Sequence, residues 1–499
     1  MSSDGFARLT ADEAAALIPD NAFVAFSGFT PAGAAKAVPR ALAERAERAH
    51  AAGDPMRFRV LAGASTGDDV DERLAQAEAI AWRAPYQSSR TLRKQINAQQ
   101  AEFVELHLSN VGQMMAFGFL PRPDVAVVEA TDVTRDGRVY LSTSSGVTPT
   151  VLKHADRVVI ELNRRHTPRL AEMHDVAILP TPPHRSPIPI HNPLDRIGTP
   201  FIAVDPDRIV GVVETDEADG LAPAAPMNEV SERIAGHIVE FLLAELRAGR
   251  IPPQFLPLQA GVGNVANAVL SGLGSHPDVP PFSMYTEVFQ DSQVELMRSG
   301  KLLGASTSAL ALSDGLMDEV CGDVDFFGER IVMRPTEFSN NPGVIRRLGV
   351  IAINTVLEMD LVGCANSTHV CGTQVMNGIG GSGDFVRNSF LSILVSPSTA
   401  KNGAISAVVP LCSHVDHNEH SVQVLVTEQG LADLRGLGSI ERSRVIAERC
   451  AHPSYRPYLL EYLESAPKGH IRQHLDRAFE LHRNLVEHGS MLPEVASGV

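Results

Sequence analysis

Short apolar runs that do not alternate with polar residues limit the possible fold of this chain more than any other feature. Residues 125–128, 157–160 and 209–213 are rich in β-branched side chains and too short for helices. Strands of this kind are buried on both faces, as in parallel sheets. Alanine-rich stretches at residues 36–51 and 69–81 have helical composition and separate other such runs. This alternation predicts an α/β architecture in which helices cover a parallel sheet.

The chain of 499 residues is too long for one ordinary core, so we expect two domains. Residues 216–226 form a small, acidic break with two prolines, and Asn228 is a good N-cap for a helix that runs to about residue 248. We therefore predict an N-terminal domain of residues 1–220 and a C-terminal domain of residues 221–499.

The second half of the sequence has the same alternation of short strands and helices as the first. Its expected elements are strands at residues 258–260, 350–353, 391–395 and 422–427 and an amphipathic helix at residues 470–488.

An internal similarity links the openings of the two halves. Residues 23–33 and residues 256–264 both have the pattern of a strand, a glycine-containing turn and the start of a helix. The sequence therefore predicts an α/β protein with two similar open parallel-sheet domains that face a cleft.

Charge and cysteine content narrow the possible partners and the compartment. The net charge is −16 and basic residues form no long cluster, which argues against nucleic acid and anionic membranes as partners. The five cysteines contain no Cys-x-x-Cys pair, which favours free thiols in a reducing compartment. Residues 1–15 lack the features of a signal peptide, and no apolar run is long enough to span a membrane. We expect a cytoplasmic protein without a membrane partner.

Two glycine-rich segments are candidates for ligand loops. Residues 378–383 match G-x-G-x-x-G, but Lys401, Asn402 and Gly403 stand where a dinucleotide site needs an acidic residue. This segment is either a loop whose bare backbone approaches a ligand or a flexible turn. Gly261 and Gly263 sit at a strand-to-helix turn, where open N–H groups could bind an anion; a tight packing turn explains them nearly as well.

Glu287 is a candidate nucleophile or general acid. It lies between Tyr285 and Phe289 in an apolar run, where a carboxylate is costly, although most such glutamates are exposed strand ends. Further on, Pro342 fits the first position of a helix, which makes Asn341 its N-cap. The side-chain amide of Asn340 is then left over for another purpose.

A histidine-rich segment has the residue types of a metal site. His414, His417, Glu419 and His420 are close in sequence, but their spacing is not H-E-x-x-H and no third ligand is evident. We expect no metal. Neither a nucleophile elbow nor a phosphate-binding P-loop motif occurs in the sequence.

The order of these features resembles the acetyl-CoA hydrolase/transferase family of class I CoA-transferases, over nearly the whole chain. The similarity is densest in residues 285–291, 339–348, 376–385, 396–401 and 426–435. The resemblance implies two domains of the CoA-transferase fold.

The resemblance also implies roles for individual residues. Glu287 would be the nucleophile, Asn340 and the backbone N–H of Gly381 would stabilise an oxyanion, and Glu428 would be a further active-site carboxylate. The positions that would contact coenzyme A are Gly261, Val262, Gly263, Asn264, Val265, Ala266, Asn377, Gly381 and Lys401.

The function implied is transfer of CoA between an acyl-CoA and a small carboxylate, with succinyl-CoA and acetate as the expected pair. The reaction would run by a ping-pong mechanism through a glutamyl-CoA thioester on Glu287. Acetyl-CoA hydrolysis and propionyl-CoA:succinate CoA transfer are enzymatic alternatives, and a metabolite sensor without turnover is a non-enzymatic one. We expect a homodimer and no cofactor beyond coenzyme A as a substrate.

One departure from the family pattern bears on substrate choice. Acetate-using members read Asp-Arg-Asn-Ala-Pro at the domain junction, whereas residues 219–223 here read Asp-Gly-Leu-Ala-Pro. Without the arginine we expect modest selectivity among monocarboxylates, with Arg435 as a candidate replacement cation.

Overall fold

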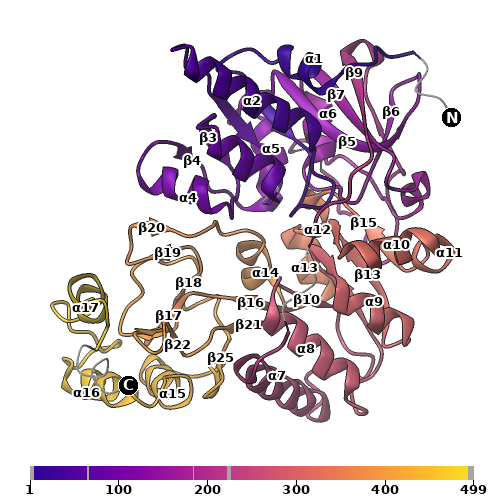
Figure 1. Ribbon diagram of the computed structural model, residues 1–499. Coiled ribbons are helices and arrows are strands. Elements are labelled where there is room, and N and C mark those ends of the chain that lie inside the picture. Colours follow the sequence, from indigo (N-terminus) through magenta and orange to yellow (C-terminus); the bar gives the residue numbers. More distant parts are fainter. Residues whose placement is uncertain (1–4, 65–66, 184, 222–225, 493–499) are drawn as a thin grey trace. The chain divides into compact units, whose positions relative to one another are not determined.

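The computed structural model describes residues 5–64, 67–183, 185–221 and 226–492. The chain divides into two compact units (Figure 1). Unit 1 combines Met1–Pro223 with Ser283–Leu348, and unit 2 combines Ala224–Phe282 with Gly349–Val499. The sequence-based division at residue 220 differs from these units in the placement of residues 283–348, and part of the junction stretch, residues 222–225, lies outside the described residues.

Residues 283–348 belong with the N-terminal half because backbone bridges and a buried ion pair join them to it. Ser144 forms a β-bridge with Ala309, and the Arg334 guanidinium pairs with the Asp175 carboxylate, both side chains of that ion pair being fully buried. Such long-range partners leave no trace in local composition, so a boundary based on composition does not detect them.

The main sheet of unit 1 is mostly parallel, as the sequence predicted. Its order is β4-β3-β2-β1-β5-β6-β8, and β7 pairs with both β5 and β9. Only the pairings of β6 are antiparallel among those described. The strands are β1 (Phe23–Phe26), β2 (Phe58–Leu61), β3 (Ile80–Ala84), β4 (Glu102–Phe103), β5 (Val125–Val133), β6 (Arg138–Leu141), β7 (Arg157–Asn163), β8 (Ile202–Ala203) and β9 (Ile209–Thr215).

Both faces of this sheet are buried, which explains the missing alternation. Val24 and Phe26 of β1 lie in the cluster that α1, α2 and α3 cover, whereas Phe23 and Ala25 lie in the cluster that α5 and α6 cover. The helices are α1 (Ala11–Ala16), α2 (Ala37–Ala51), α3 (Arg73–Gln76), α4 (Arg90–Asn97), α5 (Val111–Ala116) and α6 (Thr148–His154), with shorter helical turns at Asp68–Glu72, Leu108–Asn110, Pro168–Glu172 and Pro206–Arg208.

The second segment of unit 1 supplies short parallel strands and helices. In sheet order β15, β13 and β11 are neighbours, and β12 pairs with β14 in parallel. The elements are β11 (Phe282–Tyr285), β12 (Val288–Gln290), β13 (Leu302–Thr307), β14 (Ala309–Ala311), β15 (Ile331–Met333), α9 (Asp291–Arg298), α10 (Asp314–Gly322), α11 (Val324–Phe327), α12 (Thr336–Ser339) and α13 (Pro342–Leu348).

Unit 2 contains a second parallel-dominated sheet with strand order β10-β16-β21-β25-β26, in which only the β25–β26 pairing is antiparallel. The strands of unit 2 are β10 (Leu258–Ala260), β16 (Ile351–Thr355), β17 (Glu358–Asp360), β18 (Ala365–Asn366), β19 (His369–Val370), β20 (Gln374–Val375), β21 (Leu391–Val395), β22 (Thr399–Ala400), β23 (Ile405–Ser406), β24 (Val408–Val409), β25 (Val424–Thr427) and β26 (Gly430–Asp433). Its helices are α7 (Glu229–Arg247), α8 (Asn264–Ser275), α14 (Ser382–Asn388), α15 (Ser439–Arg449), α16 (Arg456–Ser465) and α17 (Glu480–His488).

Two expected helices are shorter than predicted. The helix expected at residues 69–81 ends earlier, because Glu78 adopts a positive φ of 53° and the chain turns into β3. The helix expected at residues 470–488 forms only as α17. Upstream of it, the Tyr462 hydroxyl accepts a hydrogen bond from the His474 backbone N–H, and this bond competes with helical pairing. Asn228, by contrast, caps α7 as predicted.

The cysteines and the helices can be compared with what the sequence predicted. All five cysteines are free, and burial raises the pKa of the Cys450 thiol to about 12. In the part of the chain that the structure describes, no helix is both long and apolar enough to cross a lipid bilayer.

A buried carboxylate fixes the start of α2. Glu161 on β7 accepts the backbone N–H groups of Lys36, Ala37 and Val38 at 2.7, 3.2 and 2.7 Å. These are N–H groups that a helix cannot pair internally, and α2 has no side-chain cap of its own. Glu161 therefore sets the position of α2 against the sheet.

We predict that Glu161→Ala lowers the free energy of unfolding by about 3 kcal/mol, because it leaves three buried donors without partners. Urea unfolding followed by circular dichroism measures the change. Glu44→Ala is the matched control, since Glu44 lies on the same helix with an exposed side chain. Equal midpoints for the two variants would contradict the capping role.

Candidate functional site

Glu287 and Asn340 are brought together in unit 1. The Asn340 side-chain amide donates a hydrogen bond to Glu287 Oε1 at 2.6 Å. Asn340 is fully buried, whereas the Glu287 side chain is partly exposed between buried neighbours. The carboxylate is therefore fixed on one side by a donor and reachable from the other.

Backbone contacts fix the position of Glu287 in the chain. Its carbonyl oxygen accepts the Ser308 N–H at 2.8 Å and the Thr307 hydroxyl at 2.9 Å. Two residues earlier, the buried Tyr285 hydroxyl donates to the Phe338 carbonyl at 2.5 Å and so ties β11 to α12, the helix that precedes Asn340. The distance between the carboxylate and the amide is thus set by two rigid elements.

The adjacent residues Asn340 and Asn341 make different hydrogen bonds, as the position of Pro342 predicted. Asn341 Oδ1 accepts the N–H groups of Gly343 and Val344 and caps α13. Asn340 Oδ1 accepts the Ser339 hydroxyl at 2.8 Å, which orients its NH₂ group toward Glu287. A polar residue next to a cap residue was the signal that made this arrangement predictable.

A second glutamate, Glu337, is buried on α12, the short helix that precedes Asn340. Its Oε1 accepts the Thr150 hydroxyl, and its Oε2 is buried without a hydrogen-bond partner among the described residues. Burial raises the pKa of the Glu337 carboxyl above its ordinary value. The glutamate next to the site is therefore held toward its neutral form.

The Gly261–Ala266 turn of unit 2 leaves backbone open to solvent. It joins β10 to α8, no side chain caps α8, and Val262 is 62% exposed. Gly263 has a φ of 119° and a Cβ there would meet no atom within 4 Å. Gly28, at the equivalent point after β1, has the same φ, but a Cβ would lie 2.8 Å from Ala34 Cα. The turn at Gly28 is therefore closely packed, whereas the turn at Gly263 is open.

The other glycine-rich segment precedes α14. Gly381 is the residue before this helix and is buried. Asn377, four residues earlier, has a buried side-chain oxygen with no partner among the described residues. An unpaired buried oxygen is costly unless a ligand or water meets it, so Asn377 fits a binding position better than a structural one.

Glu428 anchors the segment that carries Lys401. Its carboxylate accepts the Ser398 backbone N–H at 2.8 Å and the Ser398 hydroxyl. Burial alone would raise the pKa of Glu428, but the Ser398 bonds outweigh it and lower the pKa. Lys401 is exposed and has a positive φ of 48°. Both residues therefore lie at one loop of unit 2, with Glu428 as its support.

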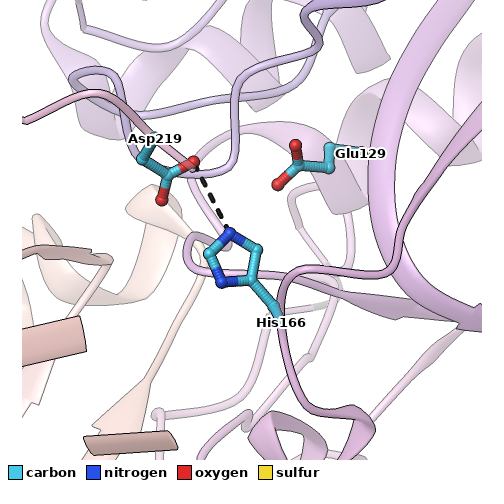
Figure 2. Close-up of side chains that lie close together, drawn as sticks. All are labelled: Glu129, His166 and Asp219. Carbon is cyan, nitrogen blue, oxygen red and sulfur yellow. Dashed lines mark ion pairs between the residues drawn. The ribbon is translucent and has the colours of Figure 1, made fainter. Parts of the chain in front are cut away.

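A different group has the geometry of a metal site. Glu129, His166 and Asp219 place ligand atoms within 4.8 Å of one another in the core of unit 1 (Figure 2). The Lys36 ammonium, however, donates to both Glu129 and Asp219, and the Glu129 carboxylate also accepts Asn163 Nδ2 at 2.9 Å. The chain's own ammonium thus takes the place of a cation between the two carboxylates.

The charges of this cluster are balanced. Burial disfavours the charged form of His166, but its contacts, first of all with Asp219, outweigh burial and raise the pKa to about 10. Burial would likewise raise the pKa of Asp219, yet the charges of Lys36 and His166 lower it. Two cations therefore face two carboxylates, which favours a structural ion cluster over a metal site.

The histidines of the histidine-rich segment contact different carboxylates. His414 Nε2 lies 3.3 Å from Asp416, and His420 Nε2 lies 3.5 Å from Glu419. Asp416 also accepts hydrogen bonds from Ser367 and Thr368. Among the described residues, this segment does not form a group with metal-binding spacing.

Arg435, the candidate replacement for the missing junction arginine, is already engaged. Its guanidinium pairs with Asp433 at 2.7 Å and with Glu245 at 2.9 Å. Because two carboxylates neutralise it, Arg435 has little charge to offer a second carboxylate of a substrate.

Comparison with known proteins identifies the family. Residues 4–214 match the acetyl-CoA hydrolase/transferase N-terminal domain, and residues 319–463 match the acetyl-CoA hydrolase/transferase C-terminal domain. The chain belongs to the acetyl-CoA hydrolase/transferase family.

Relatives in this family have two kinds of named activity. The chain is 54% identical to the propanoyl-CoA:succinate CoA transferase of Escherichia coli, covering 97% of this chain and 99% of that protein. It is 43% identical to the succinyl-CoA:acetate CoA-transferase of Clostridium kluyveri, covering 97% and 90%. It is also 40% identical to the acetyl-CoA hydrolase of Schizosaccharomyces pombe, covering 97% and 96%. The chain is an enzyme of the acetyl-CoA hydrolase/transferase family.

Solved structures confirm the predicted fold class. The 4-hydroxybutyrate CoA-transferase from Porphyromonas gingivalis superposes with a TM-score of 0.62 at 23% identity, covering 92% of this chain and 97% of that one. At this identity the likeness shows the fold alone. The chain has the CoA-transferase fold.

Sequence reasoning missed the buried ion cluster of this family member. Glu129 follows four apolar residues of β5, and Lys36 follows two alanines before a helix, so each charge comes directly after an apolar run. These two positions were the available signal. Asp219 gave none, because it lies in a polar loop.

The raised pKa of Glu337 predicts a pH dependence of stability. A carboxyl whose folded pKa exceeds its unfolded pKa stabilises the protein below about pH 4.3, and this contribution is lost as pH rises toward the folded pKa. Glu337→Gln stays neutral at every pH. We therefore predict that its stability relative to wild type increases between pH 4 and pH 8, as measured by urea midpoints.

Glu329→Gln is the control for this experiment, since Glu329 is an exposed glutamate in the same unit. It should show the same pH profile as wild type. A Glu337→Gln profile that is parallel to wild type would mean that Glu337 is ionised in the folded protein.

Proposed function

We propose that the chain is an acyl-CoA:carboxylate CoA-transferase in which Glu287 is the nucleophile. The observation that supports this most is the hydrogen bond from the buried Asn340 amide to the reachable Glu287 carboxylate. A carboxylate that is hydrogen-bonded to a positioned donor can attack a thioester. The same donor can then stabilise the oxyanion that forms.

The first half-reaction has two steps. Glu287 attacks the thioester carbonyl; a C–O bond forms, the C–S bond breaks, and the products are an acyl-glutamyl anhydride and the CoA thiolate. The thiolate then attacks the Glu287 carbonyl of the anhydride, which releases the first carboxylate and leaves a glutamyl-CoA thioester. An acceptor carboxylate reverses both steps. Because every intermediate is an anhydride or a thioester, no nucleotide is needed to supply energy.

Oxyanion stabilisation falls to Asn340 in this proposal. One positioned donor is typically worth about 3–4 kcal/mol in such reactions. The Gly381 N–H stays a predicted second donor. Asn340 is well suited because its oxygen is already bound by Ser339, so its NH₂ group keeps one direction throughout the reaction.

Coenzyme A is proposed to bind to unit 2 through the open turn of residues 261–266, Asn377 and Lys401. The turn offers backbone N–H groups at the start of α8, which favour phosphate. The exposed Lys401 ammonium can act as a point charge for another phosphate. Glu428 supports the Lys401 loop through Ser398 and is therefore a positioning residue. Coenzyme A is proposed as a substrate, with no additional cofactor.

For the substrate pair we propose succinyl-CoA or succinate together with a short monocarboxylate, acetate or propanoate. The named activities of the Escherichia coli and Clostridium kluyveri relatives share a four-carbon dicarboxylate on one side and a short acid on the other. Cytoplasmic location and a homodimer stay predictions from the sequence.

Hydrolysis is the second candidate, and the acetyl-CoA hydrolase of Schizosaccharomyces pombe supports it. The two functions differ in the acceptor. In a transferase, acetate should accelerate the loss of succinyl-CoA without releasing free thiol. In a hydrolase, free thiol should appear at the same rate with or without acetate.

We predict that Glu287→Ala reduces kcat for succinyl-CoA:acetate transfer by more than about 100-fold, because it removes the nucleophile. CoA affinity should change little. Glu295→Ala is the matched control, since Glu295 is an exposed glutamate eight residues further on. A Glu287→Ala variant with more than a hundredth of wild-type kcat would rule out the covalent role.

Trapping tests the same prediction directly. Wild-type protein incubated with an acyl-CoA and then borohydride should carry a reduced side chain at residue 287, seen as a mass change of that peptide. Kinetics should be ping-pong, with parallel double-reciprocal lines. Intersecting lines together with an unmodified peptide would count against the mechanism.

We predict that Asn340→Ala lowers kcat by about 100-fold with little change in KM, as expected for a donor used mainly in the transition state. Asn341→Ala is the matched control: it removes the α13 cap and should cost about 1 kcal/mol of stability but leave kcat near wild type. An Asn340→Ala effect confined to KM would assign this amide to substrate binding.

A further inference from the structure

Gln87 presents a buried polar group that the fold does not use. Its side chain is fully buried. Neither Nε2 nor Oε1 has a hydrogen-bond partner among residues 5–64, 67–183, 185–221 and 226–492. Native proteins rarely leave a whole carboxamide unpaired, because the buried donors and acceptor lose their bonds to water without compensation. The position therefore indicates a ligand.

The location of Gln87 in the fold is also typical of a binding site. It follows β3, at the carboxyl end of a strand in the parallel part of the unit 1 sheet. Ligands of open parallel sheets bind at the carboxyl ends of the strands. The neighbouring β1 and β2 end close by, since the Thr30 N–H donates to the Ala64 carbonyl at 2.7 Å.

An apolar cluster of mostly small residues adjoins Gln87. Tyr86, the preceding residue, packs against this cluster. We call it the acyl cluster; it consists of Phe29, Ala32, Ala64, Leu108, Val288 and Ala309. Three of its six members are alanines, so half of its side chains are single methyl groups.

The acyl cluster is continuous with the proposed nucleophile. Val288 directly follows Glu287 in the chain, and the Ala309 N–H donates to the Glu287 carbonyl at 3.2 Å. The acyl cluster thus contacts Tyr86, the chain neighbour of Gln87, and contains Val288, the chain neighbour of Glu287. A ligand that reaches from Glu287 to Gln87 would be apolar in the middle and polar at both ends.

Two hydroxyls around the acyl cluster also lack partners among the described residues. Thr30 Oγ1 and Ser144 Oγ are both buried and unpaired. Thr30 has a positive φ of 57°, a strained conformation for a β-branched residue that is typical of functional sites. Ser144 forms a β-bridge with Ala309 of the cluster. With the Gln87 amide, these hydroxyls are buried neutral groups that lack partners among the described residues.

We propose that Gln87 is a specificity-determining residue that recognises the second, non-reacting carboxylate of a succinyl substrate, with Thr30 and Ser144 as further donors. The acyl cluster takes the two methylenes, and the reacting carbonyl lies at Glu287. This inference rests on the proposed function and adds to it a device for dicarboxylates that replaces the missing junction arginine. Neutral donors suffice because a carboxylate is stabilised by two or three hydrogen bonds.

The test compares a dicarboxylate pair with a monocarboxylate pair on Gln87→Met, which keeps the length of the side chain and removes its polar atoms. We expect kcat/KM for succinyl-CoA with acetate to fall by about 10- to 100-fold, the range for a lost hydrogen bond to a charged group. The rate for acetyl-CoA with propanoate should change less than about 3-fold. Gln87→Glu should reduce succinyl-CoA use further by like-charge repulsion.

Gln95→Met on α4 is the control variant. Gln95 donates to the Ala75 carbonyl at 2.8 Å and lies outside the acyl cluster, so neither substrate pair should be affected. The urea midpoint of Gln87→Met should equal or exceed that of wild type, because no bond within the described protein is lost. An equal loss for both substrate pairs, or no loss for either, would overturn the proposal and assign Gln87 to a buried water.

A binding measurement separates this proposal from the proposed function. Calorimetric titration of wild type and Gln87→Met with succinate, and with propanoate as the reference, requires no turnover. Tighter binding of succinate that depends on Gln87 supports the recognition site even if transfer fails in wild type. Transfer in wild type with equal succinate binding to both proteins would retain the CoA-transferase and reject the role of Gln87.

Discussion

The candidate site of unit 1 depends on the hydrogen bond from the Asn340 amide to the Glu287 carboxylate. The carboxylate proposed as the nucleophile has to be reachable, yet its direction must be fixed. Three separate devices fix it here: the Thr307–Ser308 contacts to the Glu287 carbonyl, the Tyr285 bond to α12, and the Ser339 bond to Asn340. Each acts on the backbone or on the Asn340 amide oxygen, and the Glu287 side chain stays partly exposed.

The ion cluster of Lys36, Glu129, His166 and Asp219 solves a different problem in the same unit. It joins the start of α2, the middle of β5 and the loop before the junction. Hydrophobic contacts would tolerate many angles between such elements, whereas paired buried charges tolerate few. The cluster thus specifies how the junction loop leaves the sheet, and it does so with the chain's own cations.

Local sequence patterns predicted much of the secondary structure. They could not predict contacts between residues that are far apart in the sequence. Non-alternating apolar runs indicated a sheet buried on both faces, and Pro342 indicated that Asn341 caps a helix and Asn340 does not. The placement of residues 283–348 with the N-terminal half depends on partners such as Asp175 and Arg334, which are far apart in sequence. Gln87 could not be singled out either, because an unpaired amide is recognised only when its surroundings are known.

The interrupted order of the two units has a consequence for synthesis on the ribosome. Unit 1 needs residues up to 348, so residues 224–282 leave the ribosome before unit 1 is complete and before most of their own unit exists. That segment includes the long amphipathic helix α7, which packs against α8 in the same segment and also against the later strands β25 and β26. Unit 2 in turn closes late, since Glu358 on β17 pairs with His482 near the end of the chain. The α8 side of α7 can therefore be covered as soon as residues 264–275 are made, whereas its β25 and β26 side stays uncovered until residues 424–433 follow.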